Sequence, residues 1–121
     1  MIPLKMMQLY LIKKRISSIL FLFIFSFSSV IFAETPTYEI KIKDHLFMPS
    51  KLEIPAGKKV KLLILNEDAT PEEFESYELN REKVIMGRRK GIIFIGPLKA
   101  GVYPFFGEFN PQTAQGVIEA K

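Results

Sequence analysis

Apolar and polar residues alternate with a period of two through most of residues 38–121. In the first run, Tyr38, Ile40 and Ile42 alternate with charged residues, which is the pattern of a half-buried strand. Similar alternation, or a short apolar stretch bounded by Gly and Pro, predicts strands over residues 51–54, 60–65, 74–77, 91–95, 102–106 and 117–120. About seven short strands with this punctuation indicate an all-β sandwich.

Two segments depart from simple alternation. Over residues 60–65 apolar residues occupy both parities, because Leu63 and Leu65 accompany Val60, Leu62 and Ile64. This pattern predicts a central strand that is buried on both faces for part of its length. Residues 79–83 are the one place where we expect a turn of helix.

The first 33 residues have a different character. Lys13-Lys14-Arg15 precedes an apolar run over residues 16–32, which serines interrupt and which ends at Ala33. A charged segment, an apolar segment and a small residue in this order predict a signal peptide over residues 1–33. The alternative is an uncleaved anchor in the inner membrane, although the run is short against the roughly 20 residues of a transmembrane helix. We therefore expect a periplasmic domain over residues 34–121.

Charge and cysteine content narrow the classes of function. The chain carries 17 Lys and Arg against 13 Asp and Glu, a net charge of +4. The four surplus cations lie in the predicted leader (Lys5, Lys13, Lys14 and Arg15), so residues 34–121 are formally neutral. No basic stripe remains to suggest a nucleic-acid partner. The chain has no cysteine, which excludes a disulfide, a thiolate nucleophile and a Cys-ligated metal.

Three motifs in order resemble a cupredoxin. They are Phe47-Met-Pro49 with the segment 52–57, Leu65-Asn66 with the segment 70–74, and Gly101-Val-Tyr-Pro-Phe-Phe-Gly107 with Asn110-Pro111 and Gly116. The closest resemblance is to EfeO-type cupredoxin-like domains of bacterial periplasmic proteins connected with iron and copper uptake. It implies a Greek-key β-sandwich over residues 34–121.

The resemblance fails at the copper ligands. Glu72 stands where the family has its first histidine, Gly107 where it has cysteine, Asn110 where it has the second histidine, and Thr113 where it has methionine. A type 1 copper centre needs a thiolate together with two imidazoles. The sequence therefore excludes type 1 copper and the electron transfer that depends on it.

Other side chains offer a rebuilt metal site. His45, the single histidine, lies in the loop between the first strands, which in a cupredoxin-like fold is at the same end as the ligand loops. We expect His45 near Glu72, Glu73, Glu108 and Asn110. Oxygen donors with one imidazole suit an iron ion or Cu²⁺. The alternative is that His45 and the acidic segment 67–82 are solvated surface residues.

The first functional hypothesis is a metal-binding accessory protein of an iron or copper uptake or homeostasis system, with the metal ion bound by these five residues. The second is a metal-free interaction domain. The end of the fold that carries Phe105, Phe106 and Phe109 would then dock a membrane permease or another periplasmic subunit. A third is Fe²⁺ oxidase activity, which needs a redox-active metal and is not preferred because the sequence offers few strong ligands for one. The sequence contains no catalytic triad, phosphate loop, CxxC or HExxH motif.

Overall fold

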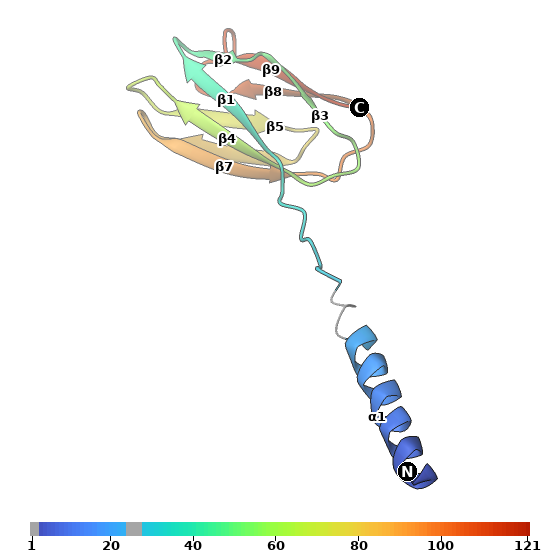
Figure 1. Ribbon diagram of the computed structural model, residues 1–121. Coiled ribbons are helices and arrows are strands. Elements are labelled where there is room, and N and C mark those ends of the chain that lie inside the picture. Colours follow the sequence, from blue (N-terminus) through green and yellow to red (C-terminus); the bar gives the residue numbers. More distant parts are fainter. Residues whose placement is uncertain (1–2, 24–27) are drawn as a thin grey trace. The chain divides into compact units, whose positions relative to one another are not determined.

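The computed structural model describes residues 3–23 and 28–121 (Figure 1). The chain divides into two compact units, residues 1–33 and 34–121. The first contains helix α1 (Leu4–Phe23). Among the described helices, none combines the length and the apolarity that crossing a bilayer requires. The predicted signal peptide includes residues 1–2 and 24–27, which lie outside the described residues, so it stays a prediction.

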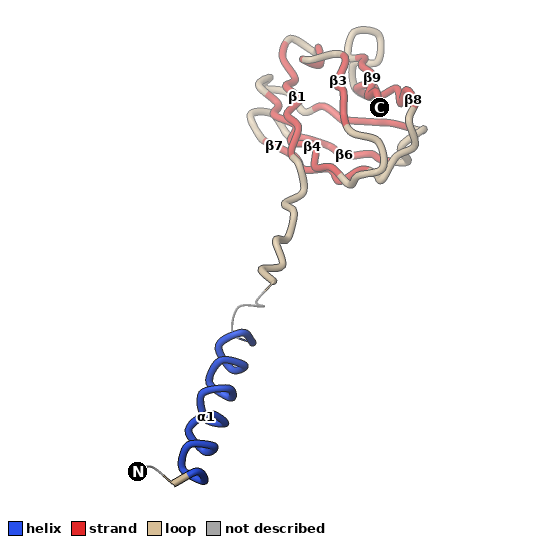
Figure 2. The backbone as a smooth tube through the Cα atoms, turned by 45° about the vertical axis from the view of Figure 1, so that its right-hand side comes forward, coloured by secondary structure: helices blue, strands red, loops and turns tan. Residues whose placement is uncertain are grey.

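The second unit consists of strands joined by short loops (Figure 2). Within the described residues the strands are β1 (Thr37–Lys43), β2 (Leu46–Met48), β3 (Lys51–Ile54), β4 (Val60–Asn66), β5 (Glu72–Ser76), β6 (Arg81–Ile85), β7 (Lys90–Ile95), β8 (Gly101–Gly107) and β9 (Gln115–Ala120). They form a four-stranded sheet in the order β2-β1-β4-β7 and a five-stranded sheet in the order β3-β9-β8-β5-β6. The prediction of an all-β sandwich is confirmed.

The period-two pattern explains why these segments form a sandwich. In β4 every second residue is fully buried, and β7 shows the same alternation from Gly91 to Ile95. Strand β1 runs parallel to β4, and β3 runs parallel to β9, whereas the other pairs are antiparallel. Each sheet therefore turns one apolar face inward, and burying these faces against each other drives folding.

Aromatic side chains join the two sheets in the core. The ring of Phe105 on β8 lies 4.9 Å from that of Phe47 on β2 and 5.0 Å from that of Phe74 on β5, between centroids. All three side chains are buried. Full burial of such a side chain stabilises the fold by about 1.5–3 kcal/mol, so this cluster is a large part of what holds β2 against the other sheet.

The set of predicted elements needs three corrections. Strands β2 and β6 were not predicted, and the helical turn expected over residues 79–83 is wrong, because Arg81–Ile85 pairs antiparallel with β5 and places Glu82 opposite Glu75. Strand β4 is central, as predicted, and lies between β1 and β7. Its outward residues Leu63 and Leu65 are only half-buried, because none of the described strands covers that face of the sheet.

Candidate functional site

The turn between β1 and β2 places His45. Asp44 and His45 have φ angles of 53° and 59°. Their backbone N–H groups donate to Oδ1 and Oδ2 of Asp68 at 2.8 and 3.0 Å, so one carboxylate stabilises the whole turn. The His45 amide is also the main cause that lowers the pKa of Asp68 below its ordinary value. The His45 ring reaches the same carboxylate, with Nδ1 3.7 Å from Oδ2.

The same turn contacts the loop that joins β8 to β9. The Thr113 hydroxyl donates to the backbone carbonyl of His45 at 3.1 Å. The two residues are 68 positions apart in the chain. The prediction that His45 lies at the same end of the fold as the segment 107–116 is therefore confirmed.

Glu72, the first residue of β5, is the centre of this end. Its side chain is buried, with only 1% of the residue exposed. Oε1 accepts from the backbone N–H of Glu73 at 3.0 Å and of Phe109 at 2.9 Å, and Oε2 accepts from Nδ2 of Asn110 at 2.7 Å. Hydrogen bonds to both oxygens offset the cost of burying the carboxylate and join β5 to the loop after β8.

Gly107, at the end of β8, makes this arrangement possible. A Cβ atom on Gly107 would lie 2.6 Å from Cδ of Glu72 and 2.7 Å from Cβ of Ala114. The Gly107 N–H donates to the carbonyl of Ala114 at 2.8 Å, which closes the loop. The glycine is therefore needed for space, because any side chain here would displace the buried carboxylate.

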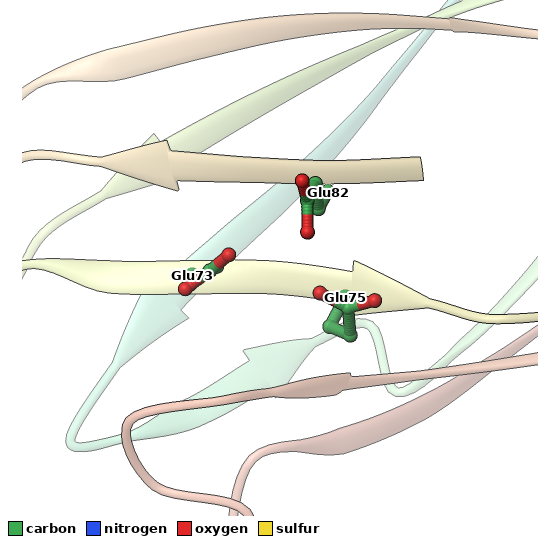
Figure 3. A group of neighbouring side chains, drawn as sticks. All are labelled: Glu73, Glu75 and Glu82. Atoms are coloured by element: carbon green, nitrogen blue, oxygen red, sulfur yellow. The ribbon is translucent and has the colours of Figure 1, made fainter. Parts of the chain in front are cut away.

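Glu73 turns away from Glu72, and Glu108 lies near enough to Glu75 to affect the pKa of that carboxyl. Neighbouring residues of a strand point to opposite faces, so Glu73 lies on the outer face of β5. Its carboxylate lies with those of Glu75 and Glu82, whose oxygens all come within 4.8 Å of one another (Figure 3). Burial is the main cause that raises the pKa of Glu75, and the negative charges of Glu82, Glu73 and Glu108 raise it further.

The five residues predicted as metal ligands therefore share one end of the fold, but their side chains take three directions. Glu72 and Asn110 bind each other, Glu73 and Glu108 lie near Glu75, and His45 faces Asp68. In the part of the chain that the structure describes, the one group of three converging ligand-type residues is Glu73, Glu75 and Glu82. Three partly exposed acids are common on protein surfaces, and we assign no metal to them.

Asn66, at the end of β4, belongs to one of the motifs that resemble a cupredoxin but was not predicted to take part in the site. It is buried, and its Nδ2 donates to the carbonyls of Thr70 at 2.9 Å and Ile85 at 3.0 Å. Its Oδ1 accepts from the N–H of Asp68 at 3.0 Å. Asn66 thus holds in place the segment that carries Asp68. The signal in the sequence was a polar residue directly after an apolar strand.

The residues at this end do not fit a type 1 copper ion. The chain has no cysteine, and Gly107 leaves no room for a ligand side chain. The oxygens of Glu72 already accept three hydrogen bonds from protein groups. At the two positions where the resemblance places histidine ligands, the side chains of Glu72 and Asn110 are therefore directed at each other.

Comparison with protein families and other proteins gives two matches. The family model of the cupredoxin-like domain matches residues 15–120. An uncharacterized protein of Rickettsia prowazekii (strain Madrid E), RP394, is 49% identical over 80 residues. That match covers 66% of this chain and 64% of the relative, so the chain spans somewhat less than two thirds of the length of the relative.

Solved structures show the same fold at low sequence identity. Auracyanin A, a "blue" copper protein from Chloroflexus aurantiacus, has a TM-score of 0.63 and 14% identity, over 73% of this chain and 100% of that one. Amicyanin from Paracoccus versutus has a TM-score of 0.56 and 14% identity, over 77% and 87%. A purple cupredoxin from Nitrosopumilus maritimus has a TM-score of 0.53 and 20% identity, over 69% and 98%.

Proposed function

Since this chain belongs to the family of cupredoxin-like domains, we propose that it uses the cupredoxin fold as a metal-free binding domain rather than as a copper electron carrier. The observation that carries the proposal is the buried carboxylate of Glu72, which accepts hydrogen bonds from Glu73, Phe109 and Asn110. These bonds occupy the end of the fold at which the resemblance places copper ligands.

The energetics of this network support the proposal. A hydrogen bond to a charged group contributes about 1.5–3 kcal/mol, and a metal ion that took Glu72 as a ligand would have to replace such bonds. The donors Phe109 N–H and Asn110 Nδ2, which are partly buried, would then lose their acceptor, and an unpaired donor costs at most about 1–3 kcal/mol when it is fully buried. The end of the fold is therefore stable without an ion.

The surface around this network suggests how a partner is bound. Phe109 is 48% exposed and Phe106 is half-buried, whereas Phe105 belongs to the core. Exposed aromatic residues beside a rigid loop suit contact with another protein. We place the domain in the periplasm, in a bacterial iron or copper uptake system as in EfeO-type proteins, where this end docks a permease or another subunit. The leader pattern and the sequence resemblance support that placement.

Calorimetry and crosslinking test the proposal together. Residues 34–121, which contain every described strand and the whole core, are titrated with Cu²⁺ and with iron, and we expect no stoichiometric binding. A photo-crosslinker at Phe109 in cells should capture a membrane protein, whereas the same probe at Val102, exposed at the other end of β8, should not. Binding of one metal ion that Glu72→Gln abolishes would overturn the proposal.

Metal binding in iron or copper uptake is the second candidate. It is favoured by the presence of Glu72, Glu73, Glu108 and Asn110 at one end of the fold, because their oxygen atoms suit iron and Cu²⁺. It requires a rearrangement in which Glu72 leaves its hydrogen bonds. In that case His45→Ala should weaken the binding of the ion, and unchanged binding in this variant would remove His45 from the ligand set.

A further inference from the structure

A second feature at this end of the fold is an open hollow beside the first sheet, with a volume of about 660 Å³. Three segments form its wall: the end of β1, the end of β4, and the turn that leads into β7. The lining residues are Lys43, Leu65, Asn66, Glu67, Arg88, Arg89 and Lys90. Four of them are cationic and one is acidic, although residues 34–121 as a whole are formally neutral. We propose that this hollow is an anion-binding site that takes a phosphate group.

Of the four cations, Arg88 lies near enough to Asp68 to help lower the pKa of that carboxyl, but none is held in a close ion pair in the described residues. In the described part of the chain, no ion pair within 4.0 Å involves Lys43, Arg88, Arg89 or Lys90. The acid in the wall, Glu67, lies 3.6 Å from the amino group of Lys41 instead. Neighbouring like charges repel each other, so a bound anion would relieve this repulsion as well as gain attraction.

The wall of the hollow is held by backbone hydrogen bonds before any ligand arrives. The N–H of Arg88 donates to the carbonyl of Asp68 at 2.9 Å, and the N–H of Asn66 donates to the carbonyl of Arg89 at 2.9 Å. The Arg88 guanidinium also donates to the carbonyl of Glu67. These bonds tie the turn before β7 to the end of β4. A site that is already ordered loses less entropy when it binds its ligand.

The chemistry of the wall favours phosphate over a simple monovalent ion. A phosphate monoester carries a charge of about −1.5 to −2 at neutral pH, so several cations can share it. The guanidinium groups of Arg88 and Arg89 present planar pairs of donors that match phosphate oxygens. Leu65 adds an apolar wall that suits the organic part of an ester. The volume lies within the range of roughly 300–1,000 Å³ typical of small-ligand pockets.

Two sources provide a phosphate group: a soluble phosphate compound, which can carry more than one negative charge, and the headgroup of an anionic phospholipid, whose phosphate is a diester with a single negative charge. Residues 34–121 are titrated with pyrophosphate by calorimetry at low ionic strength. The same protein is sedimented with vesicles of phosphatidylglycerol and, as a control, of phosphatidylcholine. Without residues 1–33, vesicle binding cannot come from the apolar N-terminal run. Binding of pyrophosphate alone identifies a soluble ligand, and binding of phosphatidylglycerol vesicles identifies the lipid headgroup.

Variants locate the binding in the hollow. The double variant Lys43→Gln and Lys90→Gln should weaken binding on the order of tenfold, and raised salt should weaken wild-type binding. The matched control, Lys58→Gln and Lys99→Gln, removes the same charge from exposed residues outside the hollow and should bind like the wild type. Equal weakening in both variants, or no binding of either ligand at low salt, would overturn the proposal. A circular dichroism melt confirms that each variant is folded.

The anion site and the proposed function are tested separately. Metal titration and crosslinking at Phe109 concern the Glu72 network, whereas the anion titration concerns the cations of the hollow. A metal ion bound at Glu72 would therefore contradict the proposed function but not the proposed anion site.

Discussion

Oε2 of Glu72 accepts a hydrogen bond from Nδ2 of Asn110 at 2.7 Å, across 38 positions of the chain. Both residues stand at positions where the family resemblance places histidine ligands. A contact between two protein side chains therefore connects β5 to the loop after β8. The stability of this end depends on that pair and on Gly107, which gives Glu72 its space.

Replacing Glu72 with Ala should lower the free energy of unfolding by about 3 kcal/mol or more. The variant leaves the partly buried N–H groups of Glu73 and Phe109 and the amide of Asn110 without their acceptor, and each such loss costs about 1 kcal/mol, the low end of the range for buried unpaired groups. Urea denaturation of residues 34–121 measures the change. Glu73→Ala, on the outer face of the same strand, is the control. Equal losses in the two variants would show that the Glu72 network contributes little.

Replacing Gly107 with Ala should destabilise the domain by about 1–3 kcal/mol through overpacking. The added Cβ would lie 2.6 Å from Cδ of Glu72 and 2.7 Å from Cβ of Ala114. At Gly101, on the same strand, the nearest atom to an added Cβ is Cε2 of Tyr103 at 3.7 Å, so Gly101→Ala is a matched control. Thermal melts compare the two variants, and similar midpoints would contradict the crowding seen at Gly107.

Asp68 should make the free energy of unfolding of the domain depend on pH in the acid range. Because hydrogen bonds from the His45 and Asp44 amides lower its pKa in the folded state, its contribution is complete above the ordinary value of 3.8. The contribution is lost as the pH falls from 3.8 through the lowered pKa. Asp68→Ala should cost about 1–2 kcal/mol at pH 7, and the difference from the wild type should shrink below pH 3.8. Denaturation curves from about pH 2 to about pH 7 measure this trend.

The control for Asp68 is Asp44→Asn, a change on the exposed side of the same turn. This variant should follow the wild type at all pH values. A constant difference between Asp68→Ala and the wild type across the acid range would mean that the charge of Asp68 does not stabilise the turn.

Glu75 should have the opposite effect on stability. Its pKa in the folded state is raised, first by burial and then by Glu82, Glu73 and Glu108, so the ionised form is disfavoured by folding. Glu75→Gln should therefore raise the melting temperature at pH 7, and this gain should disappear as the pH falls through the raised pKa to the ordinary value of 4.5. Glu78→Gln in the exposed turn is the control. Lower stability of Glu75→Gln at pH 7 would contradict repulsion among these acids.

The sandwich was predictable where burial follows the pattern of the sequence. In β1, β4 and β7 every second residue faces the core, and the alternation of apolar residues reports this directly. Strand β6 was missed because four of its five residues are exposed, so no alternation marks it. It forms at the edge of its sheet because β5 provides hydrogen-bond partners, which is information from another part of the chain.

The candidate site was predictable as a region and not as a set of contacts. The turn at His45 and the segment 107–116 do meet at one end of the fold. Successive residues of a strand point to opposite faces of the sheet, so the neighbours Glu72 and Glu73 face opposite sides. Asn66 and Asp68 organise the region through hydrogen bonds to backbone groups, which every residue carries and which no sequence pattern distinguishes.

The sequence by itself determined that no thiolate copper site exists here and that the chain folds as a β-sandwich, because composition and periodicity are properties of the chain alone. Only the tertiary structure decided that the carboxylate of Glu72 would bind the Phe109–Asn110 loop and that Asp68 would stabilise the turn at His45. These partners lie far apart along the chain, and a hydrogen bond requires a distance and a direction that only the packed sheets provide.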